Sequence, residues 1–304
     1  TRSPGDAVKA GEHLLTITTP KLTMEIEAPV SGVLKEILVP ADEIARIAAH
    51  FVEPPYVELA RDSVNYHAAL ADSRPFSRWA SRNVAAHKRT GYAIVTLSLK
   101  KTGVPPGDLT ADQMDTVAEL ADRYSFGELR VTHEQNLVLA HVLQADLHAL
   151  WGELRALGLA TPNIGLLTDI VCCPGGDFCA LANARSIPIA EAIQRRFDDL
   201  DYLHDLGDLE LNISGCMNAC GHHHVGHIGI LGVDKNGSEW YQVTLGGAQG
   251  SAASLGKVIG PSFAAEEMPD VIERIVDVYV ERRLDGEPFI EAVRRLGIEP
   301  FRER

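Results

Sequence analysis

The pattern of apolar and polar positions changes character along the chain. Residues 1–43 alternate the two around turn formers, as in residues 23–27 (TMEIE), which predicts short β-strands. From residue 44 to about 90 the apolar residues recur with helical spacing, and Phe76 and Trp79 are the expected core anchors there. From residue 91 onward, strand and helix patterns alternate. The prediction is an α+β protein with a short all-β segment at its N-terminus.

Residues 91–160 contain the patterns of three strands and two helices. Thr110 and Gln113 form a capping-box signature before the first helix, and Gly158 follows the second helix as a C-terminal stop. The predicted elements are strand 92–101, helix 111–124, strands 127–132 and 136–142, and helix 146–157. This β-α-β-β-α order is typical of a ferredoxin-like half-domain.

Residues 161–304 form the last predicted domain, again of α+β type. A buried strand at 209–213 is followed by a hairpin, 227–234 and 240–245, with Asn236-Gly237 as its turn. Two helices, 266–283 and 288–296, end the chain. We therefore expect four segments, with bounds 1–43, 44–90, 91–160 and 161–304.

All five cysteines fall between positions 172 and 220, and four of them are spaced as Cys173-x5-Cys179 and Cys216-x3-Cys220. Four thiolates are the usual ligand set of a cubane iron–sulfur cluster. Structural zinc is the competing metal, but its cysteine pairs are usually similar and closely spaced. Inert buried thiols are the third alternative. Cys172, next to a ligand, points the other way in an extended segment, so we expect a small buried apolar residue.

Two local features favour a bulky inorganic group near Cys173. Gly175 and Gly176 allow the backbone to pass close to it. A helix predicted over 179–185 places Cys179 at a helix N-terminus, where the helix dipole stabilises a thiolate.

Composition narrows the class of partner. A formal net charge of −14 and a pI near 5.3 argue against nucleic acid and against an anionic membrane surface. The sequence shows neither a secretory signal nor an apolar run of about 18 residues, so the expected location is cytoplasmic. A basic group is predicted either to meet a carboxylate-rich cofactor or acidic electron donor, or to be a solvated helix face: Arg78, Arg82, His87, Lys88 and Arg89.

Three motifs together resemble the sirohaem-dependent sulfite and nitrite reductases. They are Cys173-x5-Cys179, the run 215–221 (GCMNACG) followed by 228–232 (IGILG), and the signature 130–136 (RVTHEQN). The resemblance spans residues from about 43 to 304. It implies a 4Fe–4S cluster on Cys173, Cys179, Cys216 and Cys220, with Cys220 bridging the cluster to the sirohaem iron.

The same resemblance marks this chain as one of the family's two similar halves. Glu134 stands where the first half carries a basic residue, so the second half is expected. Arg130 is then either a structural residue or a sirohaem contact. Asn218, Gly221 and His222 are the other expected cofactor contacts. The histidines at 222–224 and 227 are predicted to line the macrocycle or to pack in a loop, with a second metal as the remaining alternative.

Residues 1–43 resemble part of a lipoyl or biotinyl carrier domain. The matching features are the run 5–11 (GDAVKAG), Lys21 at a hairpin and the run 28–32 (APVSG). Lys21 is therefore either a lipoate attachment site or an ordinary turn lysine.

The implied function is six-electron reduction of sulfite to sulfide, with nitrite reduction to ammonia as the alternative. The implied electron donor is a ferredoxin or a flavoprotein, and the implied protein partner is the missing N-terminal half or a second copy. A non-catalytic iron–sulfur electron-transfer fragment without sirohaem is the alternative from another class.

Overall fold

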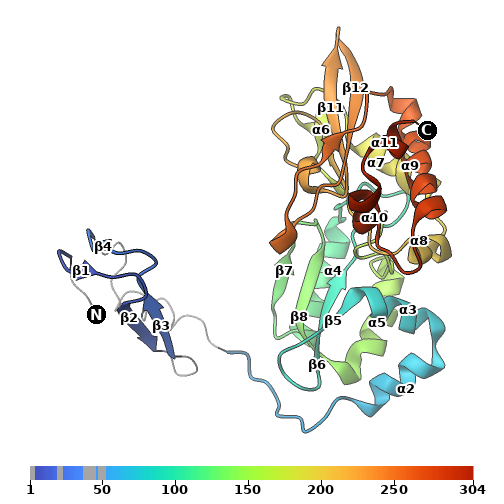
Figure 1. The fold of residues 1–304 in the computed structure, drawn as a ribbon. Coiled ribbons are helices and arrows are strands. Elements are labelled where there is room, and N and C mark those ends of the chain that lie inside the picture. The colour runs from blue at the N-terminus through green and yellow to red at the C-terminus, as the bar shows by residue number, and fades with distance from the viewer. Residues whose placement is uncertain (1–3, 19–22, 37–45, 47–52, 304) are drawn as a thin grey trace. The chain divides into compact units, whose positions relative to one another are not determined.

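The computed structural model describes all residues except 1–3, 19–22, 37–45, 47–52 and 304 (Figure 1). The chain divides into two compact units, Thr1–Val57 and Glu58–Arg304. The first unit contains two antiparallel pairs: β1 (Ala7–Val8) with β4 (Gly32–Val33), and β2 (His13–Thr18) with β3 (Thr23–Glu27). These strands confirm the predicted all-β segment, while Lys21 lies outside the described residues.

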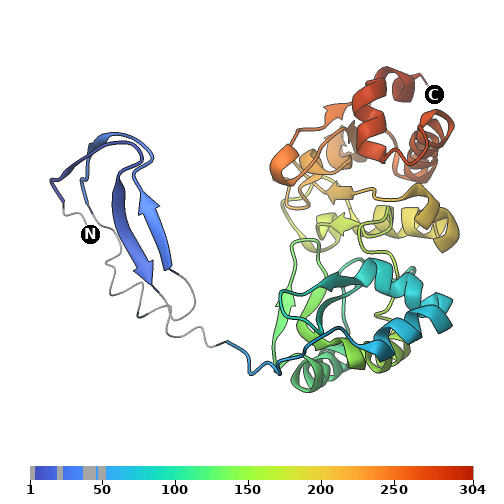
Figure 2. The same ribbon diagram turned by 60° about the horizontal axis from the view of Figure 1, so that its bottom comes forward.

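The second unit begins with two helices, α2 (Val64–Asp72) and α3 (Arg74–Asn83), shown in cyan in Figure 2. The helical pattern expected from residue 44 to about 90 forms helices only in part of the range that the structure describes. Residues 53–63 are not helical, and 84–86 form strand β5, which pairs with β6 (Tyr92–Leu97). Val84 lies opposite Val95 in this pair, so pairing with β6 decides the local structure.

The ferredoxin-like half-domain is a four-stranded antiparallel sheet with helices α4 (Ala111–Tyr124) and α5 (Leu147–Leu157). Its strand order is β5-β6-β8-β7, where β7 is Leu129–Val131 and β8 is Leu137–Leu143. The capping box at Thr110 and Gln113 is confirmed, as is Gly158, which adopts a left-handed conformation after α5. Phe76 anchors the core beside Trp79 and Trp151, with ring centroids 5.8 and 5.4 Å away.

The last domain is a five-stranded sheet in the order β13-β12-β11-β10-β9. The strands are β9 (Val171–Cys172), β10 (Leu211–Ser214), β11 (Ile228–Lys235), β12 (Ser238–Leu245) and β13 (Lys257–Val258). Strands β9, β10 and β11 run parallel, and the others are antiparallel. The hairpin turn at Asn236-Gly237 is confirmed, and both residues have positive φ.

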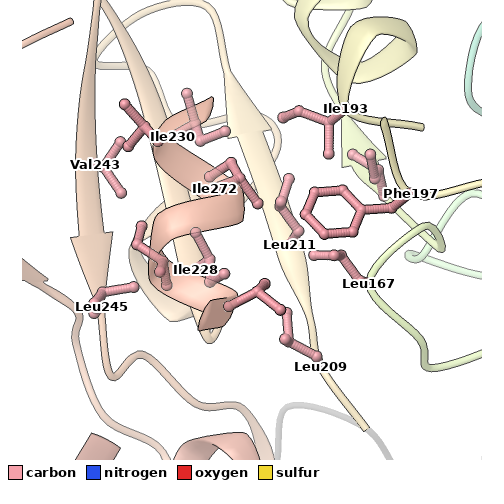
Figure 3. Packing of buried hydrophobic residues seen from close by; sticks show 14 of the residues in the cluster. Leu167, Ile193, Phe197, Leu209, Leu211, Ile228, Ile230, Val243, Leu245 and Ile272 are labelled. Atoms are coloured by element: carbon pink, nitrogen blue, oxygen red, sulfur yellow. The ribbon is translucent and has the colours of Figure 1, made fainter. Parts of the chain in front are cut away.

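Helices cover this sheet and close its core. They are α6 (Gly175–Phe178), α7 (Ile187–Arg196), α8 (Leu200–Leu206), α9 (Met268–Arg282), α10 (Phe289–Leu296) and α11 (Glu299–Arg302). Ile272 of α9 packs on Ile228 and Ile230 of the central strand (Figure 3). None of the described helices is long and apolar enough to span a membrane.

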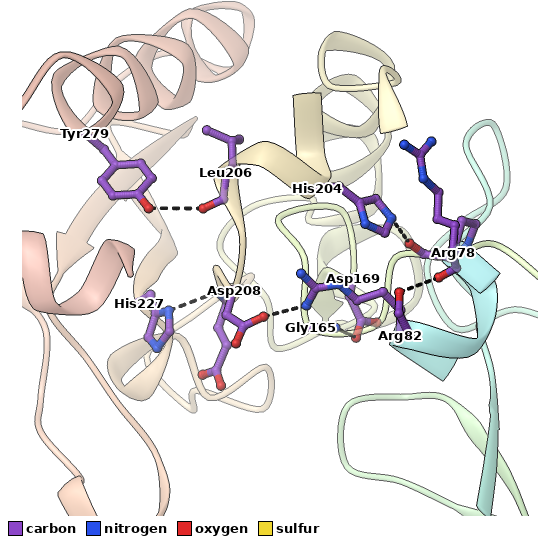
Figure 4. A network of polar contacts seen from close by, with 12 residues as sticks. Arg78, Arg82, Gly165, Asp169, His204, Leu206, Asp208, His227 and Tyr279 are labelled. Atoms are coloured by element: carbon purple, nitrogen blue, oxygen red, sulfur yellow. Dashed lines mark hydrogen bonds and ion pairs between the residues drawn. The ribbon is translucent and has the colours of Figure 1, made fainter. Parts of the chain in front are cut away.

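Polar contacts tie helix α3 to the last domain. Arg82 of α3 pairs with Asp208 at 2.6 Å (Figure 4), and Arg78 pairs with Asp201. Within the last domain, His204 Nε2 lies 2.9 Å from the Pro162 carbonyl oxygen (Figure 4). Arg78 and Arg82, two members of the predicted basic group, thus form ion pairs with carboxylates of this chain. We infer that they orient one domain on the other.

Candidate functional site

The two cysteine segments leave neighbouring parallel strands at the same edge of the sheet. Cys172 ends β9 and lies opposite Ile213 of β10. Cys173 therefore comes directly after the carboxyl end of β9. Cys216 lies two residues after Ser214, which is the carboxyl end of β10. Both thiols are buried, and the Cys173 amide donates to the Ile213 carbonyl at 3.1 Å. Sheet topology thus brings together residues more than forty positions apart.

Gly215 links the two segments directly. Its N–H donates to Cys173 Sγ at 3.0 Å, and its carbonyl accepts from the amides of Asn183 and Ala184 at 2.8 and 3.0 Å. A Cβ at Gly215 would lie 2.6 Å from the Ala184 carbonyl oxygen and 2.8 Å from the Gly175 Cα. No side chain fits this close approach of two backbones.

The helix predicted at 179–185 is wrong. The helix that forms is α6, a single turn over Gly175–Phe178, and Cys179 caps its C-terminal end. The amide of Ala184 bonds to Gly215 and its carbonyl to Gly176, so these groups are not available for helical bonds. Cys179 therefore gains no stabilisation from a helix N-terminus.

The second cysteine segment turns back onto β10. Ala219 and His222 both have positive φ, and the Gly221 amide donates to Ser214 Oγ at 3.1 Å. A Cβ at Gly221 would meet the Ile213 carbonyl group, with its carbon 2.8 Å away. Asn218, Cys220 and His222 are exposed on this turn, whereas Gly221 is buried inside it. The turn thus presents Cys220 to the outside.

Cys172 is buried as predicted and belongs to the hydrophobic core of the last domain. Burial raises the pKa of its thiol, which disfavours the thiolate that metal binding needs. Its backbone is held by Gln135, whose side-chain amide bonds to both the N–H and the carbonyl of Cys172, at 2.9 and 2.7 Å. Sequence reasoning quoted Gln135 in the signature but assigned it no role, because its partner is distant in sequence.

Comparisons with known proteins identify the family. Residues 90–157 match the family described as nitrite/sulfite reductase ferredoxin-like half domain, and residues 165–304 match the nitrite and sulphite reductase 4Fe-4S domain. The chain belongs to the nitrite and sulfite reductase family. Residues 1–47 match the family described as biotin-requiring enzyme, in agreement with the carrier-like segment.

Relatives within the reductase family include both kinds of enzyme. Ferredoxin–nitrite reductase of Synechococcus elongatus is 32% identical over 69% of this chain and 41% of its own length. Sulfite reductase [ferredoxin] of Mycobacterium tuberculosis is 31% identical over 67% of this chain and 39% of its own. The solved NirA protein of Mycobacterium tuberculosis superposes with a TM-score of 0.60 at 28% identity, covering 73% of this chain and 41% of that one. The chain spans about two fifths of the length of these reductases.

The donor set fits the family's iron–sulfur cluster. Four thiols are grouped in two segments, glycines allow close backbone approach, and the Gly215 N–H···S bond is of the type that stabilises cluster sulfurs. Within the described part of the chain, no three His, Cys, Asp or Glu side chains converge closely enough to hold a metal ion. The fold thus aligns the two segments without gathering all four thiols around one point.

Sirohaem fits the described residues less well. Two small cavities, of about 270 and 100 Å³, lie beside Asn212, and His222 lines the smaller one. Their lining includes Glu134, Asp169 and Glu210, and no Lys or Arg is among the described residues that line them. A macrocycle whose rim carries carboxylates requires cations, so these two cavities do not hold sirohaem by themselves.

The remaining predicted contacts differ in their surroundings. His227 packs in the core as the loop-packing alternative states: its Nδ1 accepts from the Glu210 amide at 3.2 Å and its ring stacks on Phe289. Burial lowers the pKa of His227. Arg130 lies exposed on β7 and pairs with Glu128, so its contact with sirohaem stays a prediction. The roles of Asn218, Gly221 and His222 toward the cofactor also stay predictions.

Proposed function

We propose that this chain is the cluster-bearing half of a reductase that converts sulfite to sulfide or nitrite to ammonia. The observation that carries the proposal is the pair of cysteine segments at the carboxyl ends of β9 and β10, joined by the Gly215 N–H···Sγ bond to Cys173. Relatives named as ferredoxin-dependent nitrite and sulfite reductases support both substrates.

In this proposal Cys173, Cys179, Cys216 and Cys220 hold a 4Fe–4S cluster, and Cys220 is also the catalytic bridge to sirohaem. When bound, the cluster and sirohaem would supply electrons to the anion in single-electron steps. The chain's own contribution is to orient the thiolates and to offset their charge with backbone amides such as that of Gly215. Exposure of Cys220 leaves its sulfur accessible to a second group.

The proposal includes partners and a location. A ferredoxin or a flavoprotein supplies electrons, and the cations that the cavity lining lacks come from the N-terminal half or from a second copy. Five free thiols suit the reducing cytoplasm. The match of residues 1–47 to biotin-requiring enzymes supports lipoate or a related group on Lys21, for which intact-mass measurement is the test.

A non-catalytic electron-transfer module is the second candidate function. It is favoured by the acidic lining of the cavities beside Asn212. Such a module would assemble the cluster and bind no sirohaem.

The deciding experiment is anaerobic purification with sirohaem supplied in the cell, followed by assay of iron, acid-labile sulfide, sirohaem and turnover of each anion. About four cluster irons per chain, sirohaem and turnover support the reductase. Cluster without sirohaem supports the electron-transfer module, and absence of a cluster refutes both. Cys220→Ser is expected to abolish turnover, and Cys172→Ala, which alters a buried thiol outside the ligand set, is the matched control. Turnover by the Cys220 variant would refute the bridging role.

A further inference from the structure

The strand that leads into Cys173 lies at the edge of its sheet. β9 pairs with β10 on one side, and no further described strand pairs with it on the other. An open edge leaves backbone N–H and C=O groups without partners. Here two side chains from the half-domain occupy that edge, Gln135 and Lys100.

The side chain of Gln135 takes the place of a neighbouring strand beside Cys172. Its Oε1 accepts from the Cys172 N–H at 2.9 Å, and its Nε2 donates to the Cys172 carbonyl at 2.7 Å. Two residues that face each other in an antiparallel sheet exchange the same pair of bonds. Lys100 extends the contact, because its Nζ donates to the Ile170 carbonyl at 2.8 Å and lies 3.4 Å from Gln135 Oε1.

The loop that carries Gln135 is itself held in place. Gln135 has a φ of 61°, and its amide donates to the Thr132 carbonyl at 3.1 Å. The neighbouring Asn136 donates from Nδ2 to Asp169 Oδ1 at 2.9 Å. Asp169 in turn accepts from the Gly165 amide at 3.0 Å (Figure 4). The loop therefore holds the segment before Cys173 at residues 169 and 172, and Lys100 holds it at residue 170.

Lys100 brings a buried charge to this edge, and the carboxylate of Asp169 attracts it. The side chain of Lys100 is 1% exposed, and burying an ammonium group is costly unless it serves a compensating interaction. Its bond to Ile170 lies three residues before the first predicted ligand. A cation at this place offsets the negative charge of thiolates bound to iron.

We propose that Gln135 and Lys100 form a surrogate strand that fixes the backbone before Cys173 and so positions the first cluster ligand. The cluster part of this inference rests on the proposed function. Both residues are positioning residues, since they act through the backbone of Ile170 and Cys172. The consequence is that retention and electronic state of the cluster depend on side chains of the half-domain.

The test compares two Gln→Asn variants that shorten an amide side chain by one methylene. Asn tolerates positive φ, so Gln135→Asn removes reach without adding backbone strain. Gln113→Asn is the control, because Gln113 also makes two side-chain bonds, from the Thr110 amide and to the Leu157 carbonyl, each 2.9 Å. Both variants are expected to lose similar stability in urea.

Hydrogen exchange and cluster release separate the two variants. Gln135→Asn is expected to speed exchange of residues 170–173 and loss of iron to a chelator by about tenfold each. It is also expected to change the electron paramagnetic resonance spectrum of the reduced cluster. Gln113→Asn is expected to leave all three unchanged. Lys100→Met is expected to lower the cluster's reduction potential, because it removes a buried positive charge.

The outcomes distinguish this inference from the proposed function. Failure of the unaltered chain to bind a cluster would refute the proposed function, and exchange in the iron-free chain would still test the surrogate strand. Equal exchange and equal iron loss in the two Gln→Asn variants would overturn the surrogate strand, whatever the reductase does. Faster exchange in Gln135→Asn with unchanged iron loss and spectrum would overturn the positioning role.

Discussion

Substitution of Gly215 by alanine adds one methyl group at the point where the cysteine segments meet. The new Cβ would lie 2.6 Å from the Ala184 carbonyl oxygen, 2.8 Å from the Gly175 Cα and 3.0 Å from Ser186 Oγ. Two of these three atoms are backbone, so they move only if the loop around Cys173 moves. The hydroxyl of Ser186 also lies 3.5 Å from Cys173 Sγ. The methyl group therefore displaces the ligand loop rather than a free side chain.

The size of the effect follows from these distances. Ordinary contacts of a Cβ begin near 3.4 Å, so the two segments must separate by roughly 0.8 Å. Overpacking of this kind costs about 1–3 kcal/mol. Weakening of the bonds that Gly215 makes with Cys173, Asn183 and Ala184 adds to that cost, at about 0.5–1.5 kcal/mol for each bond lost. We expect Gly215→Ala to lower the free energy of unfolding by about 2–4 kcal/mol.

Urea unfolding of the iron-free chain measures this loss, and iron and sulfide assays measure cluster retention. The control is Gly152→Ala in α5, where an added Cβ meets nothing within 4 Å and the helix gains about 0.5–1 kcal/mol. Gly215→Ala is expected to lose most of its cluster, and Gly152→Ala to keep it. An unfolding free energy within about 1 kcal/mol of the unaltered chain, together with a full cluster, would refute the reasoning.

Three further substitutions test other contacts. Burial lowers the pKa of Lys100 to about 8, so between pH 8 and 10.5 the chain takes up a proton when it unfolds. The free energy of unfolding of the unaltered chain, relative to that of Lys100→Met, should therefore rise by about 3 kcal/mol over that range. A difference between the two proteins that stays constant with pH in urea unfolding would contradict this. Arg82→Ala should cost less than about 1 kcal/mol, because its partner Asp208 is exposed; thermal unfolding in low and high salt checks it. Tyr279→Phe should cost about 1 kcal/mol in urea unfolding, since its hydroxyl lies 2.7 Å from the Glu287 carbonyl; an unchanged midpoint would show that the bond contributes nothing.

Local patterns predicted the elements whose signals lie within a few residues. The capping box at Thr110, the stop at Gly158 and the turn at Asn236-Gly237 are all confirmed, because each depends on bonds between neighbours in sequence. The four-cysteine spacing and the signature at 130–136 also predicted the family. These features needed no knowledge of the fold.

The wrong predictions concern segments whose backbone hydrogen-bond partners lie outside the segment itself. The sequence predicts a helix at 179–185, yet the amides of Asn183 and Ala184 bond to Gly215, and the Ala184 carbonyl accepts from Gly176. Residues 84–86 continue a helical pattern, yet they pair with β6. In both places a partner outside the segment competes for the same N–H and C=O groups. The partner wins because tertiary packing outweighs helix propensity, which is worth less than about 1 kcal/mol per residue.

By itself, the sequence determined the cysteine spacing, several local caps and turns, and the family. The tertiary structure decided how these parts act on one another. It placed Gly215 against Cys173, turned Cys172 into the core, and set Gln135 beside the strand that leads to the first ligand. The chemistry of each side chain follows from the residue type at that one position. These contacts, by contrast, join segments about forty positions apart. They exist only in the folded chain, where distant segments pack together and their backbone polar groups pair.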